Sequence, residues 1–149
     1  MLRTLLRLTL VAALLSLSAA RAVGAPNVYH LSGGGTASIS QFAMNVSVEG
    51  SGSASGSFEC LMAGRSGFVL GDFGLAHSMI VHATPSTGSV AGSVVNFAGT
   101  GRLTLDGRQK MDIHVQVWAD IATQTFQLTV VEVGAMPVES LTSGRIALK

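Results

Sequence analysis

The sequence predicts a small all-β domain, an antiparallel sandwich or a small closed barrel of about eight short strands, behind a cleaved signal peptide. Apolar and polar residues alternate with a period of two along most of the chain after residue 25. Glycine-rich turns separate the alternating runs, and no window has a helical period. Without helical crossovers the strands cannot be parallel, so we expect antiparallel pairing.

The N-terminal segment has the pattern of an export signal. Arg3 and Arg7 precede an apolar run at residues 8–17, and small residues lead from it to Ala20-Arg21-Ala22. A basic region, an apolar region and an A-x-A site in this order are typical of a secretory signal peptide. We expect cleavage after Ala22, with Val23-Gly24-Ala25 as a second site.

This pattern divides the chain into a signal peptide at 1–22 and a single mature domain at 23–149. The apolar run is about half as long as a membrane-spanning helix. We therefore expect a secreted or periplasmic bacterial protein with no membrane anchor after cleavage.

Removal of the signal reverses the sign of the net charge. The full chain has nine Lys and Arg against eight Asp and Glu, and three of the arginines leave with the signal. Six basic residues then face eight acidic ones, a net charge of −2, which gives no electrostatic reason to bind nucleic acid or an anionic membrane. With 48% hydrophobic and 11% charged residues, the chain has the composition of a packed globular protein.

The first clear strand covers residues 42–49, and glycine, serine and alanine at 50–56 predict a flexible hairpin connection. The next strand runs over 57–62 and breaks at 63–67. Within it, Cys60 shares a side with Phe58 and Met62. As the only cysteine it forms no intramolecular disulfide, and we expect it to be a buried apolar residue.

The middle of the chain is less regular. Residues 68–75 contain Gly71 and Gly74, which predicts a short strand with a bulge. A strand at 79–84 is expected to stop at Pro85, with a turn at 86–88. Residues 89–102 then predict one long strand or two short ones.

Asp106-Gly107 is the clearest turn signal in the sequence. In the strand that follows it, Met111, Ile113, Val115 and Val117 face one way, and Asp112, His114, Gln116 and Trp118 face the other. Later strands are predicted at 125–133 and 144–148, the last with Ile146 and Leu148 facing inward.

The candidate binding surface is the polar face of that strand: Asp112, His114, Gln116 and Trp118. Trp118 is the only tryptophan. An aromatic ring beside hydrogen-bonding side chains is typical of platforms that bind carbohydrate or peptide. Two alternatives stay open, that this face is the solvent side with Trp118 under a loop, or that it lines a barrel.

No catalytic residues, metal ligands or cofactors are predicted. No G-x-S-x-G elbow marks a serine nucleophile. Asp112 and Asp120 lie about 26 Å apart on an extended strand, too far to act as a glycosidase pair. The histidines have no paired spacing that suits zinc: His30, His77, His82 and His114.

Several stretches resemble the small secreted bacterial β-domain called the post-COAP domain. They include Gly33-Gly34-Gly35-Thr36, Gly56-Ser57-Phe58-Glu59-Cys60, residues 94–101, 115–120 and 125–130, and Gly144-Arg145-Ile146-Ala147-Leu148. The resemblance covers residues from about 30 to the end and implies a compact barrel or sandwich with no established activity. The chain departs from it at 120–124, where a single aspartate replaces an acidic link.

These observations favour an exported non-catalytic module that binds an unknown ligand or protein partner. Two alternatives stay open. One is a small secreted hydrolase or lyase with its site in a barrel mouth around His114, and the other is a lipocalin-like carrier with an apolar ligand inside a barrel. Few Lys or Pro residues guard the strands, so oligomerisation through sheet edges also stays open.

Overall fold

The computed structural model describes residues 27–64 and 77–149, and the regular structure within them is entirely β-strand. One antiparallel sheet contains nine strands: β1 (Val28–Ala37), β2 (Gln41–Glu49), β3 (Ala54–Met62), β4 (Met79–Ala91), β5 (Val94–Leu105), β6 (Gln109–Asp120), β7 (Thr125–Val130), β8 (Gly134–Ala135) and β9 (Glu139–Leu148). The predicted all-β class is confirmed. The predicted signal peptide, both cleavage sites and the predicted irregular segment at 68–75 lie outside the described residues.

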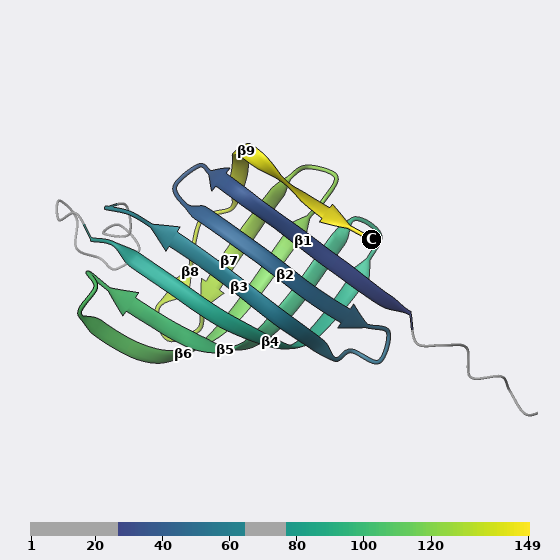
Figure 1. The fold of residues 1–149 in the computed structure, drawn as a ribbon, viewed down its shortest axis with the longest axis horizontal. Coiled ribbons are helices and arrows are strands. Elements are labelled where there is room, and N and C mark those ends of the chain that lie inside the picture. The colour runs from purple at the N-terminus through teal and green to yellow at the C-terminus, as the bar shows by residue number, and fades with distance from the viewer. Residues whose placement is uncertain (1–26, 65–76) are drawn as a thin grey trace, which may run out of the picture.

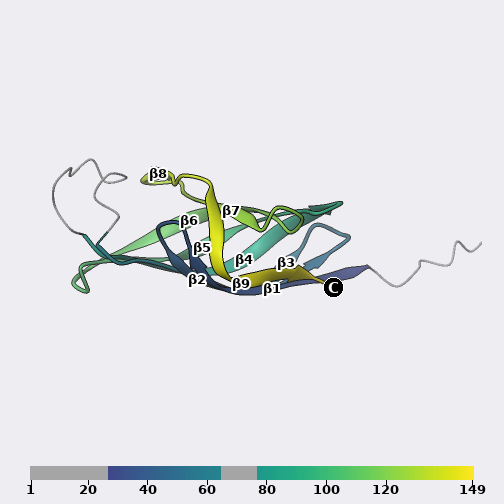
Figure 2. The ribbon, with the colours of Figure 1, turned by 90° about the horizontal axis from the view of Figure 1, so that it is seen from above.

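The sheet closes on itself. Its strand order is β6-β5-β4-β3-β2-β1-β9-β7-β8, and an additional pairing of β6 with β7 makes a ring of eight strands. Figure 1 shows β1, β2 and β3 crossing in front of β5, β6 and β7. Seen from above, the ring is flattened, and β9 bends from the β7 side to the β1 side (Figure 2). The fold therefore has the closed ring of a barrel and the two facing walls of a sandwich.

A cluster of phenylalanines joins the two walls. The ring centroid of Phe126 on β7 lies 4.6 Å from that of Phe42 on β2 and 6.5 Å from that of Phe58 on β3. Phe58 also meets Phe97 of β5 edge to face at 5.7 Å. All four side chains are buried, and each contributes about 1.5–3 kcal/mol by leaving water. The interior is thus filled with apolar side chains, as the alternating pattern predicts.

The strand β4 corrects one prediction. Pro85 does not stop the strand, because a bulge between Pro85 and Thr87 absorbs it. Beyond Ala83, β4 has no continuous ladder with β3, so the N–H group that proline lacks is not needed there. The predicted turn at 86–88 lies within β4, and Gly92-Ser93 forms the actual turn into β5.

One further prediction, at β7, is wrong, and one residue of β6 is more exposed than its neighbours on the same face. The strand predicted at 125–133 ends at Val130, and a turn follows. Met111, predicted to share a face with Ile113, Val115 and Val117, is 46% exposed, whereas those three are buried. The reason is that β7 pairs with β6 only from Val115 onward, so the first half of β6 extends past the covered part of the ring.

The strand β1 was not predicted, because its centre is Gly33-Gly34-Gly35 and carries no apolar alternation. The glycines are needed where the backbones of the paired strands β1 and β9 approach closely. A Cβ on Gly35 would collide with the carbonyl oxygen of Ser143, and one on Gly144 would collide with that of Gly34. Both positions also have positive φ, which L side chains rarely adopt.

The seam between β7 and β9 is the shortest part of the ring. Only Thr125 with Ser140 and Phe126 with Glu139 are paired there. The side chain of Gln124 extends the seam, because its Nε2 donates to the Ile146 carbonyl at 2.9 Å and its Oε1 accepts from the Ile146 N–H at 2.8 Å. The amide of Gln124 thus replaces the peptide group of a neighbouring strand.

A buried carboxylate joins the same seam to the turn between β1 and β2. Glu139 is 1% exposed. Its Oε2 accepts hydrogen bonds from the backbone N–H groups of Ile39 and Ser40, both at 3.0 Å, and the Ser40 hydroxyl lies 2.8 Å from Oε1. The carboxylate can be buried here because these hydrogen bonds satisfy its two oxygen atoms.

We expect Glu139→Gln to lower the free energy of unfolding by about 1–3 kcal/mol, because the amide places N–H groups where the Ile39 and Ser40 donors need an acceptor. Urea unfolding measures the change. Glu59→Gln is the matched control, since the Glu59 side chain is exposed and, among the described residues, its one polar partner is the His82 ring at 3.1 Å. The control is expected to change stability by less than about 0.5 kcal/mol. Equal losses in the two variants would contradict the role given to Glu139.

Cys60 is expected to resist thiol reagents in the native state. It is 1% exposed, and burial raises the pKa of its thiol to about 12. The reactive thiolate is therefore scarce at neutral pH. Labelling by a chromogenic disulfide reagent should be slow in buffer and immediate in denaturant, and fast stoichiometric labelling of the folded domain would contradict this burial.

Candidate functional site

The four residues of the candidate surface occupy alternate positions on the outer face of β6. They do not line the interior of the ring, which the odd-numbered residues Ile113, Val115 and Val117 fill. Each has a paired residue on the neighbouring strand β5: Arg102 for Asp112, Thr100 for His114, Ala98 for Gln116 and Asn96 for Trp118.

An uncharged hollow of about 470 Å³ lies over the Trp118 end of this face. Two rows of outward side chains cross β4, β5, β6 and β7 there: Ser89, Asn96, Trp118 and Gln127 in one, and Thr87, Ala98, Gln116 and Thr129 in the other. Among the described residues, none of those that line the hollow is charged.

Several polar groups in this hollow are available to a ligand. Within the described part of the chain, the side chains of Asn96, Gln116 and Trp118 make no hydrogen bond to the protein. Gln127 is held in place, because its Nε2 donates to the Met136 carbonyl at 2.8 Å, which leaves its own carbonyl oxygen as an acceptor. The hollow therefore combines an indole with hydrogen-bond donors and acceptors.

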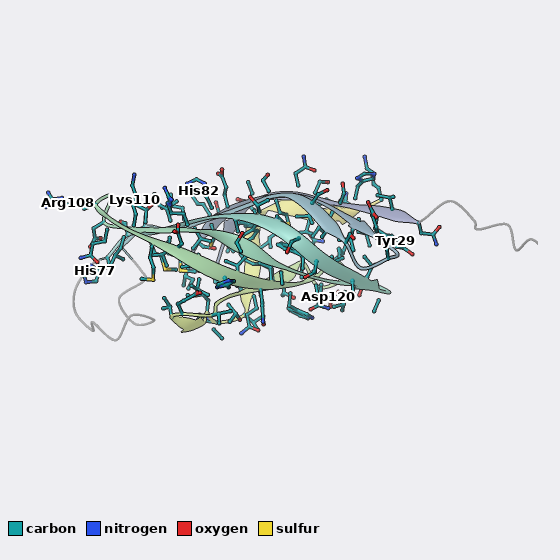
Figure 3. The ribbon with its side chains drawn as sticks, turned by 90° about the horizontal axis from the view of Figure 1, so that it is seen from below. Tyr29, His77, His82, Arg108, Lys110 and Asp120 are labelled. Atoms are coloured by element: carbon teal, nitrogen blue, oxygen red, sulfur yellow. The ribbon has the colours of Figure 1, made fainter. Side chains whose placement is uncertain are left out.

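The other end of the face is charged. Arg102 donates from Nε and Nη2 to Oδ1 of Asp112 at 3.4 and 3.3 Å. A hollow of about 630 Å³ lies over these two residues, His82 and His114. In Figure 3, His82 lies at the same end of the molecule as Arg108 and Lys110. The Arg102–Asp112 and His82–Glu59 ion pairs are both exposed, so each contributes only about 0–1 kcal/mol to stability.

His114 is oriented by Glu132, which follows β7. The ring Nδ1 lies 2.7 Å from Glu132 Oε1, and the backbone N–H of His114 donates to both carboxylate oxygens at 3.0 and 2.9 Å. These hydrogen bonds, first from the ring and then from the backbone, hold the pKa of Glu132 below its usual value of 4.5. Because the ionised carboxylate can only accept, Nδ1 carries a proton and Nε2 is directed away from Glu132.

The described residues offer little for catalysis or metal binding. A serine–histidine contact joins His30 Nδ1 to Ser47 Oγ at 3.0 Å, but no carboxylate in the described ranges contacts His30. Asp112 is the fourth residue of β6 and Asp120 is its last, so they are eight residues apart on one strand. Residues 27–64 and 77–149 contain no group of three histidine, cysteine or acidic side chains placed to hold a metal ion. They also contain no helix with the length and hydropathy to cross a bilayer.

Comparisons with family models, curated proteins and solved structures find no match. The resemblance to the post-COAP domain stays a prediction. Sequence reasoning missed Asn96, Gln127 and Thr129 as residues of the hollow. The Asp106-Gly107 turn signal alone would not have identified Asn96, because a two-residue loop pairs Leu105 with Arg108. The loop has three residues and pairs Leu105 with Gln109, which places Asn96 opposite Trp118.

The lowered pKa of Glu132 predicts how stability changes in acid. A group whose pKa is lower in the folded than in the unfolded chain stabilises the fold above its unfolded pKa, and this contribution is lost as pH falls below 4.5. The free energy of unfolding of the wild type should therefore fall more steeply with acidification than that of Glu132→Gln. Parallel pH profiles for the two proteins would show that the contact with His114 does not favour the ionised carboxylate.

Proposed function

We propose that the chain is an exported, non-catalytic binding module that holds a neutral, hydroxylated ligand, a sugar ring, against Trp118 on the outer face of β4 to β7. The observation that carries the proposal is the uncharged hollow, in which the only tryptophan stands in one row with Asn96 and Gln127 across three paired strands.

The chemistry of the hollow suits a sugar. The C–H face of a sugar ring packs against an aromatic surface, and its hydroxyl groups both donate and accept hydrogen bonds. Asn96 and Gln116 can do both as well, and the indole N–H can donate. The absence of charge in the lining residues favours a neutral ligand over an acidic or basic one.

The packing of the ring supports surface binding over the two alternatives. The phenylalanine cluster and the buried residues around it occupy the space where a lipocalin-like carrier would hold an apolar ligand. Glu132 holds Nδ1 of His114 as the acid of a catalytic triad would, but a hydrolase would also need a nucleophile at Nε2, and no described serine, threonine or cysteine side chain makes a hydrogen bond there. The resemblance to the post-COAP domain, which implies no activity, agrees with a module of this kind.

Export fits the same proposal. A signal peptide at 1–22 would deliver the module to the periplasm or the outside of a bacterial cell, where polysaccharides are abundant. One ring stacked on one indole in a shallow hollow is expected to bind weakly, with a Kd in the millimolar to micromolar range, about −4 to −8 kcal/mol.

The test is Trp118→Ala in the mature domain, titrated with glucose, N-acetylglucosamine and cellobiose. We expect binding of at least one sugar by the wild type, seen by NMR chemical-shift changes and by Trp118 emission, and at least a tenfold loss of affinity in the variant, about 1.4 kcal/mol. NMR also shows whether the variant is folded.

Tyr29→Ala is the matched control, since it removes the only tyrosine from β1, outside the hollow. This variant should bind like the wild type. Absence of binding by the wild type to every sugar, or equal binding by Trp118→Ala, would contradict the proposal.

A further inference from the structure

The hollow at Trp118 is one end of a longer surface feature. It shares Ala98 and Gln116 with a second hollow of about 270 Å³. The second hollow shares Thr100 and His114 with the third, of about 630 Å³, over Arg102 and Asp112. Together the three hollows form a continuous trough along the outer face of β5 and β6.

The trough follows two strands that are regularly paired. The pairing of β5 with β6 continues without a bulge from Asn96 opposite Trp118 to Arg102 opposite Asp112. Six residues along a strand span about 20 Å. Ala98 and Thr100 are the β5 residues in the middle, and both are small. A trough of this length, with small side chains in its middle, fits a linear chain in an extended conformation.

Hydrogen-bonding groups are present at each step of the trough. Gln116 lies next to Trp118, and Thr100 faces His114, whose Nε2 points away from Glu132. The far end has one cation and one anion, Arg102 and Asp112, which largely neutralise each other. A chain with hydroxyl groups on every unit and no net charge meets a donor or an acceptor at each position.

A peptide fits the same trough less well. Extended peptides are commonly recognised by main-chain pairing with an exposed sheet edge. Along the trough β5 is paired on both sides, with β4 and with β6, so its face presents side chains and not free main-chain groups. Side-chain recognition of a chain that lies on a sheet face suits a polysaccharide better.

We infer that the trough binds a segment of an extended neutral polysaccharide along β5 and β6, with the Trp118 hollow as the binding site for one of its sugar units. This inference rests on the proposed function, because it extends the same site, and it adds the class of ligand and its direction on the protein.

The experiment measures affinity against chain length in the mature domain. Two extended series are used, cellobiose to cellohexaose and chitobiose to chitohexaose, with maltose to maltohexaose as the coiled counterpart. We expect affinity for at least one extended series to rise at least tenfold with length and then to level off once the trough is filled. The malto series should show no such rise, because its coiled chain departs from the direction of β5 and β6 after the first units.

Two variants obstruct the middle of the trough without touching Trp118. Thr100 is exposed, and Thr100→Arg and Thr100→Glu place bulky side chains of opposite charge between the first and third hollows. Both variants should keep the affinity for the disaccharide and lose the increase with length. Thr36→Arg, at an exposed threonine of β1, is the matched control and should retain the full increase.

The outcomes separate this inference from the proposed function. If disaccharides bind at Trp118 but neither extended series gains affinity with length, the trough is overturned and the sugar site stands. An increase that survives both Thr100 variants also overturns it, because the chain then leaves Trp118 in another direction. If no oligosaccharide of any series binds, both proposals fail together.

Discussion

Closure of the ring by β9 is the constraint on which the rest of the structure depends. This strand pairs with β1 along most of its length but shares only two residue pairs with β7. The side chains of Gln124 and Glu139 reinforce the seam, the first by hydrogen bonds to β9 and the second by hydrogen bonds to the turn between β1 and β2. An open seam would expose the phenylalanine cluster to water, so these polar contacts protect an apolar core.

A closed and filled ring leaves its outer face as the place for recognition. The bulge at Pro85 shapes that face, because it changes which residues of β4 point outward. Before the bulge, the even-numbered His82 and Thr84 face out; after it, Thr87 and Ser89 do so, opposite Ala98 and Asn96. The bulge thereby adds a fourth strand of polar side chains to the hollow at Trp118. Pro85, where the sequence predicts a strand end, thus belongs to the bulge that brings Thr87 and Ser89 into the site.

The parts of the fold that were predictable are those controlled by neighbours in sequence. Alternation separated the two faces of β6 correctly, although Met111 is exposed. Asp106 and Gly107 both have positive φ, as the centre of a type I′ turn requires, within a loop of three residues. The strand β1 and the burial of Glu139 depend on contacts about a hundred residues apart, with β9 and with Ser40. No local pattern encodes such contacts. In the sequence, residues 33–35 resemble a loop. Only the close pairing of β1 with β9 shows why glycine is needed there.

The position of the site on paired strands also bears on how it would bind. Asn96, Trp118 and Gln127 belong to three strands whose register is fixed by continuous ladders, and the Gln127 side chain is further held by the Met136 carbonyl. Side chains on such a scaffold lose little backbone freedom when a ligand arrives, so less of the contact energy is spent on ordering than at a loop. The same rigidity fixes the spacing of the outward side chains along β5 and β6. A ligand with a repeating unit can exploit it, because each added unit meets groups that are already in place.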